Sequence, residues 1–305
     1  MDKPILISGI HRSGSPWLGE MISLSPQVGH VHEPFNQSHG KCVCGYDIPY
    51  WYNAVTEANE DQVRRHFDHF LRFGSQTLLS DLRNGKLKKI GVQFRRGQFD
   101  LYSAVRRHRA LIKDPLALLA ADWIADAYAA QVIITVRHPA AFVDRIIRKN
   151  WTFDFRDLTS QPALLEGKLS RYAEELEHAA SIQGAAAGAK MGIEEQAILL
   201  WKVLHDVIIS YREQYPEWLI LRHEDISRNP FAHFQDLYGK LGLEFSADVR
   251  TSIAGFVNPI KETAGKRKSA DNAKRWATKI SPEMADRIRK GTEEVASNFY
   301  NNQDW

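Results

Sequence analysis

The chain has few cysteines, little net charge and no long apolar run. Cys42 and Cys44 are the two cysteines among its 305 residues. Without a second cysteine pair, the chain offers neither a disulfide framework nor a four-cysteine zinc site, and so few thiols are typical of a reducing compartment. No apolar stretch approaches the roughly 18–20 residues that span a bilayer. Asp2 and Lys3 are charged where a signal peptide would begin. We therefore expect a soluble, cytoplasmic protein without membrane insertion.

Charge is close to balanced as well. The 40 basic and 37 acidic side chains leave a formal net charge of +3, which does not suit a basic tail that binds nucleic acid. Basic residues instead gather in two stretches, 106–109 and 261–275. We therefore expect no nucleic-acid partner, and the composition leaves the oligomeric state unknown.

Short apolar runs alternate with helical patterns along the chain. The clearest helical periodicity covers 195–211, and no internal repeat is present. Strands separated by helices predict a parallel sheet covered by helices. The length allows one large domain or two smaller ones, and we predict a single domain over 1–305. The expected strands are 4–9, 27–32, 89–94, 110–113, 132–136 and 218–222.

The most informative stretch is 4–18. Its apolar run leads to Gly9, then to the segment Arg12-Ser13-Gly14-Ser15, and then to a helix-compatible pattern. A strand followed by a glycine turn and a helix presents unpaired N–H groups and a positive dipole end to an anion. Arg12 adds a full positive charge to this turn. The stretch predicts binding of a phosphate-bearing nucleotide.

What this stretch lacks narrows the choice of nucleotide. Gly9 and Gly14 have the spacing of a Walker A loop, but Ser15-Pro16 stands where that motif has Lys-Ser/Thr. The chain therefore has no lysine for the outer phosphates and no hydroxyl ligand for Mg²⁺, and we expect no metal. Pro16 is well suited to the first turn of a helix. A nucleotide kinase or NTPase with a degenerate loop is kept as an alternative.

The segment 12–17 resembles the phosphosulfate loop of sulfotransferases that use 3′-phosphoadenosine 5′-phosphosulfate (PAPS) and release 3′-phosphoadenosine 5′-phosphate (PAP). That loop has a basic residue, Ser-Gly, two hydroxyl residues and an apolar residue. Pro16 replaces one of the hydroxyl residues here. The resemblance implies a P-loop-like three-layer α/β fold with a central parallel sheet. It also implies that the donor is bound by Arg12, Ser13, Gly14, Ser15, Pro16 and Trp17.

Two further segments carry the same resemblance. The family's 3′-phosphate element has Arg-x-Pro and a serine eight positions after the arginine. Arg137 fits this element, and Arg145 takes the place of the serine. Two guanidinium groups can hold one phosphate by forked hydrogen bonds, although Arg145 could equally be an ordinary surface charge. In the segment 218–245, the pair Glu224-Asp225 resembles the family's acidic pair, which is structural.

A basic segment near the C-terminus resembles the family's loop over the 3′-phosphate. Arg267 and Lys268 match the basic pair of that loop, but Ser269 follows where the family often has glycine. The resemblance implies that both contact the 3′-phosphate, with a solvated charge run as the alternative. Trp276 either stacks on the adenine or anchors the last helix, which we expect to begin near Ser281.

Sulfuryl transfer requires a base for the acceptor proton and stabilisation of the charge that develops. Pro115 stands where the cytosolic branch of the family has its basic histidine. Glu33 follows the second expected strand and resembles the Glu-Pro element of the carbohydrate-type and bacterial branch. We rank Glu33 first as base, then Asp114, then His32, because ligands gather at the carboxyl ends of parallel strands.

Lys113 and Arg12 take the electrostatic roles in this reading. Lys113 is expected to support the sulfuryl or bridging oxygens, with a salt bridge to a nearby carboxylate as the alternative. Arg12 is expected to neutralise the departing phosphate.

Two irregular segments are candidates for the acceptor side of the site. Residues 34–60 are rich in loops and aromatic side chains, and 181–193 are rich in glycine and alanine. We interpret both as acceptor-site walls or a lid, or else as surface excursions whose aromatic residues pack on the core. The expected reaction is sulfuryl transfer to a hydroxyl of a carbohydrate or polar metabolite, with a small molecule or glycan as acceptor. A non-catalytic PAP/PAPS-binding module is the second alternative.

Overall fold

The computed structural model describes residues 3–37, 46–72, 103, 108–184, 191–257 and 274–305. Its sheet has five parallel strands in the order β2-β3-β1-β4-β5. The strand expected at 89–94 lies outside the described residues, and the other five are present within one residue of their expected bounds. They are β1 (Ile5–Gly9), β2 (Val28–His32), β3 (Arg109–Lys113), β4 (Gln131–Val136) and β5 (Leu219–Arg222).

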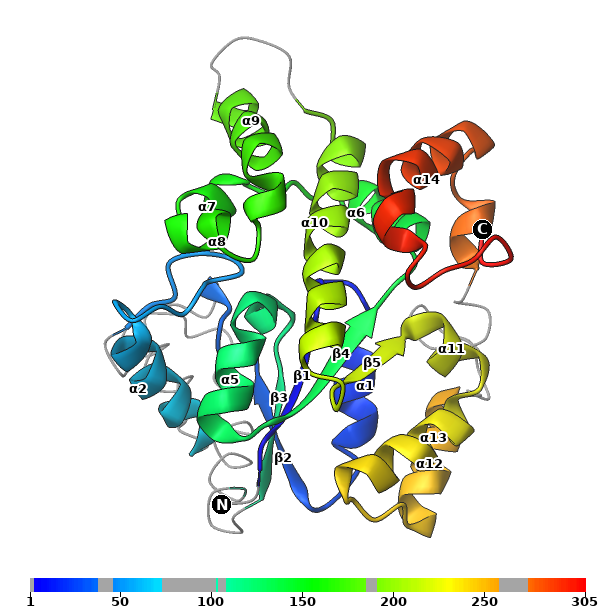
Figure 1. The fold of residues 1–305 in the computed structure, drawn as a ribbon. Coiled ribbons are helices and arrows are strands. Elements are labelled where there is room, and N and C mark those ends of the chain that lie inside the picture. The colour runs from blue at the N-terminus through cyan, green and yellow to red at the C-terminus, as the bar shows by residue number, and fades with distance from the viewer. Residues whose placement is uncertain (1–2, 38–45, 73–102, 104–107, 185–190, 258–273) are drawn as a thin grey trace, which may run out of the picture.

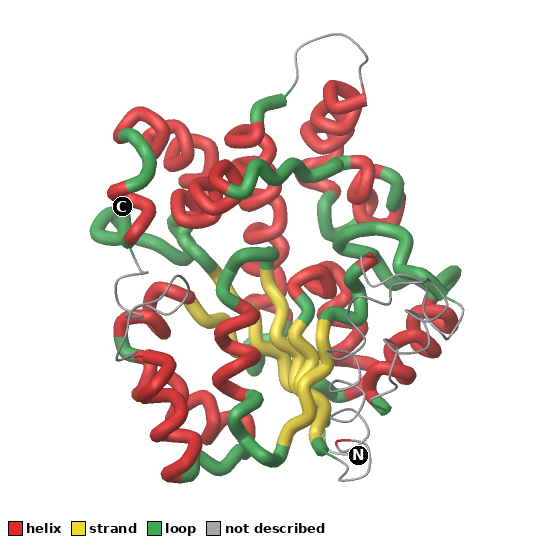
Figure 2. The backbone as a smooth tube through the Cα atoms, turned by 180° about the vertical axis from the view of Figure 1, so that it is seen from behind, coloured by secondary structure: helices red, strands yellow, loops and turns green. Residues whose placement is uncertain are grey.

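Helices cover both faces of this sheet (Figures 1 and 2), so the predicted three-layer α/β fold class is confirmed. Their bounds are α1 (Ser15–Ile22), α2 (Glu60–Leu71), η3 (Pro115–Ala120), α5 (Ala121–Tyr128), α6 (Pro139–Arg148), α7 (Arg156–Thr159), α8 (Pro162–Glu166), η4 (Ser170–Tyr172), α9 (Ala173–Gly184), α10 (Ile193–Gln214), α11 (His223–Arg228), α12 (Pro230–Leu241), α13 (Ala247–Val257), η6 (Arg275–Thr278) and α14 (Pro282–Ala296). No helix of the described chain is long and apolar enough to cross a lipid bilayer.

The alternation of side chains along β1 divides the apolar core in two. Ile5 and Ile7 belong to a cluster with α1, α12 and α13, whereas Leu6 belongs to a larger cluster with α2, α5, α6, α10 and α14. All three side chains are fully buried. Both faces of the central strand are therefore covered, which explains its continuous apolar sequence.

The strand register brings the candidate residues to one edge of the sheet. Lys113 pairs with His32 of β2 and with Ile7 of β1, and Gly9 pairs with Thr135 of β4. The segments that follow β1, β2, β3 and β4 thus leave the sheet side by side at its carboxyl edge. These segments contain the candidate anion-binding and catalytic residues.

The segment 181–193 is less irregular than its composition suggests. Residues 181–184 form the last turn of α9, Ile193 begins α10, and 185–190 lie outside the described residues. Glu195 accepts a hydrogen bond from the Gly192 backbone N–H (2.8 Å) and so closes the first turn of α10. Helical structure therefore extends into both ends of this glycine- and alanine-rich segment, because α9 ends within it and a capped helix begins within it.

Candidate functional site

The loop between β1 and α1 takes a conformation that requires glycine at two positions. Gly9 and Gly14 have φ angles of 137° and 105°. A Cβ at Gly9 would lie 2.3 Å from the Thr135 carbonyl oxygen, and one at Gly14 would lie 2.4 Å from Nδ1 of His223. Arg12 is also left-handed, with φ of 67°. Such backbone strain in a non-glycine residue is common at ligand-binding sites.

The N-terminus of α1 offers unpaired donors at the end of this loop. Ser15 begins the helix, and its Oγ is buried without a hydrogen-bond partner in the described chain. Pro16 occupies the first turn, where no acidic residue neutralises the positive end of the helix. Ser13 Oγ is instead paired with Thr135 Oγ1 (2.5 Å), and Trp17 packs edge-on against His223 (5.7 Å between ring centroids). Ser13 and Trp17 therefore shape the loop, and Ser15 lies at its end with an unpaired hydroxyl.

Three arginines gather at this loop and form no ion pair within the described residues. Arg137 Nη1 donates to the backbone oxygen of Arg12 (2.8 Å), and Nε of each residue is buried without a partner. Burial, and then the charge of Arg145, lower the pKa of Arg12, against a smaller opposing effect of Glu33. Burial lowers the pKa of Arg137 as well, where Glu224 opposes the shift and Arg145 adds to it. No ion pair to Arg12, Arg137 or Arg145 occurs within the described part of the chain. The cluster is therefore electrostatically suited to an anion.

Buried acidic and aromatic residues support Arg137 from behind. Glu224 accepts hydrogen bonds from the His138 backbone N–H and from the Tyr300 hydroxyl, both at 3.0 Å. Trp201 Nε1 donates to the backbone oxygen of Arg137 (2.9 Å). Burial raises the pKa of Glu224. These contacts give Glu224 the structural role that the sequence predicts.

Glu33 lies at the end of β2 and forms an ion pair with Lys113. Its own φ is 48°, and its Oε2 accepts a hydrogen bond from Asn36 Nδ2 (2.5 Å). Burial alone would raise the pKa of Glu33, but the hydrogen bond and charge of Lys113, together with His32 and Asn36, hold it below its usual value. The carboxylate is therefore ionised near neutral pH and able to accept a proton.

The two alternative bases occupy different surroundings. Asp114 is fully buried and accepts backbone hydrogen bonds from Phe35 (2.5 Å) and Leu116 (2.9 Å), so it caps η3. Burial raises the pKa of Asp114 to about 7. His32 is exposed and lies 3.9 Å from Glu33 Oε2. Of the three candidates, Glu33 combines an ionised carboxylate with partial access to solvent.

Lys113 connects these groups. Its side chain is 4% exposed, and Nζ lies 3.4 Å from His32 Nε2 as well as against Glu33. The stem of the side chain passes Gly19 of α1, where a Cβ would lie 3.2 Å from Lys113 Cγ. The structure thus contains the salt bridge expected as the alternative role for Lys113, and it directs the ammonium group toward Glu33.

An aromatic cavity lies on the other side of the loop between β1 and α1. The side chains of α6, α10 and the segment 151–153 enclose it together with His11 and Trp51. Burial, and then the charge of Arg12, lower the pKa of His11 to about 3, so His11 is neutral. Because Trp51 lines the same cavity as His11, it places part of the aromatic segment 34–60 next to the arginine cluster. Tyr52, in contrast, is fully buried in the core.

The C-terminal candidates divide into two groups. Arg267 and Lys268 lie outside the described residues. Trp276 is 4% exposed and stacks on His138, with centroids 4.8 Å apart and planes 9° apart. Ser281 caps α14 by accepting a hydrogen bond from Met284 (3.2 Å). Trp276 therefore anchors the C-terminal segment in the core, the second of its two expected roles, and α14 begins where predicted.

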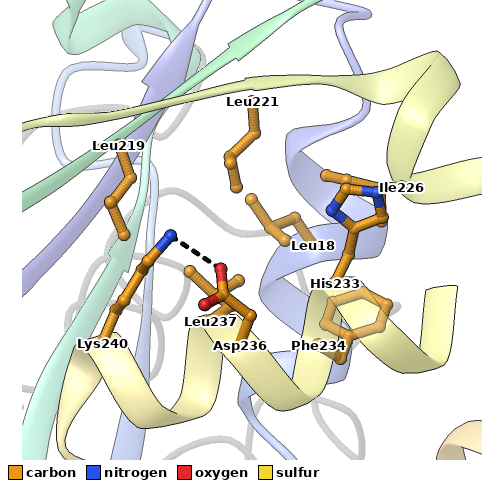
Figure 3. Close-up of a pocket in the computed structure, with 9 residues that line it drawn as sticks. All are labelled: Leu18, Leu219, Leu221, Ile226, His233, Phe234, Asp236, Leu237 and Lys240. Carbon is orange, nitrogen blue, oxygen red and sulfur yellow. Dashed lines mark ion pairs between the residues drawn. The ribbon is translucent and has the colours of Figure 1, made fainter. Parts of the chain in front are cut away.

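A second hollow lies on the opposite face of the sheet, between β5 and α12 (Figure 3). Leu219, Leu221 and Phe234 contribute to its apolar wall, and Lys240 forms an ion pair with Asp236 (2.7 Å) at its rim. None of the candidate catalytic or anion-binding residues lines this hollow. We therefore place the functional site at the carboxyl edge of the sheet.

The sequence did not point to three residues that complete the site. His223 packs under Gly14, His11 lines the aromatic cavity, and Trp151 lies under the guanidinium of Arg12. His11 and Trp151 could have been found as neighbours of matched motifs in the sequence. In the described chain, no cluster of three or more His, Cys, Asp or Glu side chains is arranged to hold a metal ion.

No protein-family model matches the chain, and no curated protein matches it. Solved structures similar to it include the sulfotransferase domain of the Synechococcus PCC 7002 olefin synthase, which is 16% identical with a TM-score of 0.49 over 98% of this chain and 95% of that chain. The sulfotransferase domain of the curacin biosynthetic pathway is 13% identical (TM-score 0.48; 98% and 97% covered). Mouse sulfotransferase SULT7A1, complexed with PAP, is 11% identical (0.44; 98% and 85%). At these low identities and TM-scores below 0.5, the similarity says nothing about the activity of this chain.

Proposed function

We propose that this protein is a PAPS-dependent sulfotransferase that transfers a sulfuryl group to a hydroxyl of a carbohydrate or polar metabolite and releases PAP. The observation that carries the proposal is the cluster of Arg12, Arg137 and Arg145. These arginines lie next to the N-terminus of α1 and form no ion pair within the described residues, although Glu33 and Glu224 act on Arg12 and Arg137 from a greater distance. A bound anion would stabilise these half-buried guanidinium groups, two of which have an unpaired Nε.

The donor-binding residues follow from this arrangement. PAPS, when bound, supplies the sulfuryl group. Arg12, Ser15 and the N-terminus of α1 hold its 5′-phosphosulfate end, while Arg137 and Arg145 hold the 3′-phosphate. Ser13 and Trp17 keep the loop in shape, Gly14 allows its close approach to His223, and Pro16 begins the helix. Arg267 and Lys268 complete the 3′-phosphate site in this proposal.

Glu33 acts as the base. Its Oε2, which also accepts a hydrogen bond from Asn36 Nδ2, receives the proton of the acceptor hydroxyl, since Oε1 is held by Lys113. Lys113 stabilises the negative charge that develops during transfer, and Arg12 neutralises the departing phosphate. The aromatic cavity next to Arg12 supports an acceptor site walled in part by Trp51.

Ligand binding tests the donor first. PAP is expected to raise the melting temperature without Mg²⁺, because a ligand that binds only the folded state stabilises it, and ATP should raise it less. Equal stabilisation by both, or a strict Mg²⁺ requirement, would support a nucleotide kinase or NTPase instead.

Product analysis then tests the transfer. Mass spectrometry of a metabolite and glycan panel incubated with the protein and PAPS should detect an added sulfonate on one class of acceptor. A non-catalytic PAP/PAPS-binding module would bind PAP tightly and transfer no sulfuryl group to any acceptor. Replacing Glu33 would then have no effect on its behaviour in either assay.

A further inference from the structure

The backbone of Trp151 is fixed by the way in which α6 ends. Asn150 has a left-handed φ of 49°. Its N–H bonds to the oxygen of Ile147 (2.9 Å), and the N–H of Trp151 bonds to the oxygen of Ile146 (3.1 Å). This pair of hydrogen bonds is a Schellman motif, in which asparagine tolerates the left-handed position. Trp151 is thereby turned back toward the loop between β1 and α1.

The indole ring of Trp151 is also held from its sides. It meets the ring of His11 at 5.4 Å and 66°, and the ring of Trp51 at 6.0 Å and 75°. His11 is itself fixed, because its Nδ1 is hydrogen-bonded to the hydroxyl of Tyr52 (2.8 Å). Edge-to-face contacts of this kind restrain the ring plane.

The guanidinium of Arg12 lies over this restrained ring, with Cζ 4.5 Å from its centroid. A carboxylate partner would also orient the arginine, but it would neutralise the charge and occupy N–H donors. An aromatic face orients a guanidinium by a cation–π contact and leaves its in-plane donors available. The unpaired Nε of Arg12 agrees with this description.

We propose that Trp151 is a positioning residue that holds Arg12 in its anion-binding orientation through the face of its indole ring. The identity of the anion as PAP or PAPS rests on the proposed function, whereas the action of Trp151 through Arg12 does not. Trp151 is thus assigned to donor binding rather than to the chemistry of transfer.

Calorimetric titration with PAP tests this assignment. Trp151→Leu removes the aromatic face and should weaken binding about five- to tenfold, whereas Trp151→Phe keeps a face and should bind within about twofold of wild type. Trp123→Leu is the matched control, because half-buried Trp123 also lies under an arginine, Arg64 (5.5 Å), but remote from the arginine cluster. Its PAP affinity should be unchanged. If Trp151→Leu does not fold, Trp151→Met replaces it.

A double-mutant cycle distinguishes positioning from a general structural effect. In an Arg12→Ala background, Trp151→Leu should cause no further loss of affinity, because the residue through which Trp151 acts is absent. An equal loss in both backgrounds, or equal binding by Trp151→Leu and wild type, overturns the inference. If PAP does not bind the wild-type protein, the proposed function fails, and the same cycle is run with inorganic pyrophosphate. The inference itself is overturned if pyrophosphate binding is absent or independent of Trp151.

Discussion

Glu33, the proposed base, and Lys113 constrain each other through their ion pair. Lys113 is almost fully buried and its ammonium contacts Glu33, so removing either charge leaves the other without its partner in a poorly solvated place. The same contact holds the pKa of Glu33 below its usual value. A carboxylate with a lowered pKa is a weaker base, but it remains ionised across the physiological range.

Glu33→Gln should lower kcat by about 10²–10⁴-fold, the usual effect of losing a general base, while PAP affinity stays nearly unchanged. Because the pKa of Glu33 lies below its usual value, the wild-type kcat should not fall through this group between neutral pH and the usual glutamate pKa. Steady-state kinetics over pH and PAP titration check both points. If the variant keeps most of its kcat, the role passes to Asp114 or His32; if it loses PAP affinity instead, Glu33 supports the loop.

Arg137→Ala should weaken PAP binding by roughly 2–4 kcal/mol, the range for charged bidentate contacts. Adenosine 5′-monophosphate, which lacks the 3′-phosphate, should be weakened much less. Arg137→Lys is the control, because it keeps the charge but not the forked geometry, and its loss should be intermediate. Equal weakening of both ligands by Arg137→Ala would make Arg137 a structural residue that acts through its hydrogen bond to Arg12.

At the scale of elements, the loop between β1 and α1 depends on contacts with three other parts of the chain. Gly9 lies against β4 and Gly14 lies against His223 at the start of α11. The carbonyl of Arg12 accepts a hydrogen bond from Arg137, which directly follows β4. The loop can therefore hold its strained conformation only when these elements are in place.

Gly14→Ala should abolish this geometry, because the new Cβ would meet the His223 ring and the residue would keep an unfavourable positive φ. We expect PAP affinity to fall at least about tenfold, together with a loss of about 1–3 kcal/mol in stability. Gly239→Ala in α12 is the control, since nothing lies within 4 Å of its Cβ position, and it should stabilise the helix by up to about 1 kcal/mol. Calorimetric titration and urea denaturation measure both changes; unaltered PAP binding in Gly14→Ala would contradict this account.

Element positions were predicted well where the signal is local. Val132–Val136 is β-branched and, apart from Thr135, apolar, and Ser281-Pro282 has the signature of a helix start, so the sequence predicts β4 and α14. The sequence does not predict the last turn of α9, because Ser181-Ile182-Gln183-Gly184 has no amphipathic repeat and leads into a glycine- and alanine-rich stretch. Contacts such as Gly14 with His223, or Arg12 with Trp151, were not predictable, because they join segments far apart in the sequence through the packing of α6 and α11.

At the scale of the whole molecule, buried histidines link stability to pH. Burial lowers the pKa of His11, His138 and His205 to about 3 in each case. The unfolded chain binds protons at these positions below about pH 6.5, and the folded chain does not. Stability should therefore fall as the pH decreases from about 6.5 toward 3. Asp114 acts in the opposite direction between its usual pKa and about 7, because burial raises its pKa.

His205→Phe isolates one of these contributions. His205 is fully buried and stacks on Trp201 at 3.8 Å, and it is not among the residues proposed to bind the donor or the acceptor. The wild-type protein should lose about 2 kcal/mol through this group between pH 7 and pH 5, and the variant should not. Urea denaturation at the two pH values measures how much stability each protein loses between them. The variant also loses the hydrogen bond to the Trp201 backbone, but this loss is the same at both pH values and cancels in the comparison. An identical pH dependence in both proteins would show that His205 is not kept neutral by folding.

Helix α6 begins two residues after Arg137, carries Arg145 in its last turns and ends in the Schellman motif that presents Trp151. Helix α6 is therefore linked to all three arginines of the cluster. Arg137 precedes it, Arg145 lies on it, and Arg12 rests on the indole ring of Trp151 at its end. In the proposed complex, a small displacement of α6 would weaken the contacts to the 5′-phosphate and to the 3′-phosphate at the same time. PAP should therefore dissociate in a single step, without an intermediate in which only one end is released. Stopped-flow displacement of PAP should then follow one exponential phase, and two well-separated phases would show that the two ends are released independently.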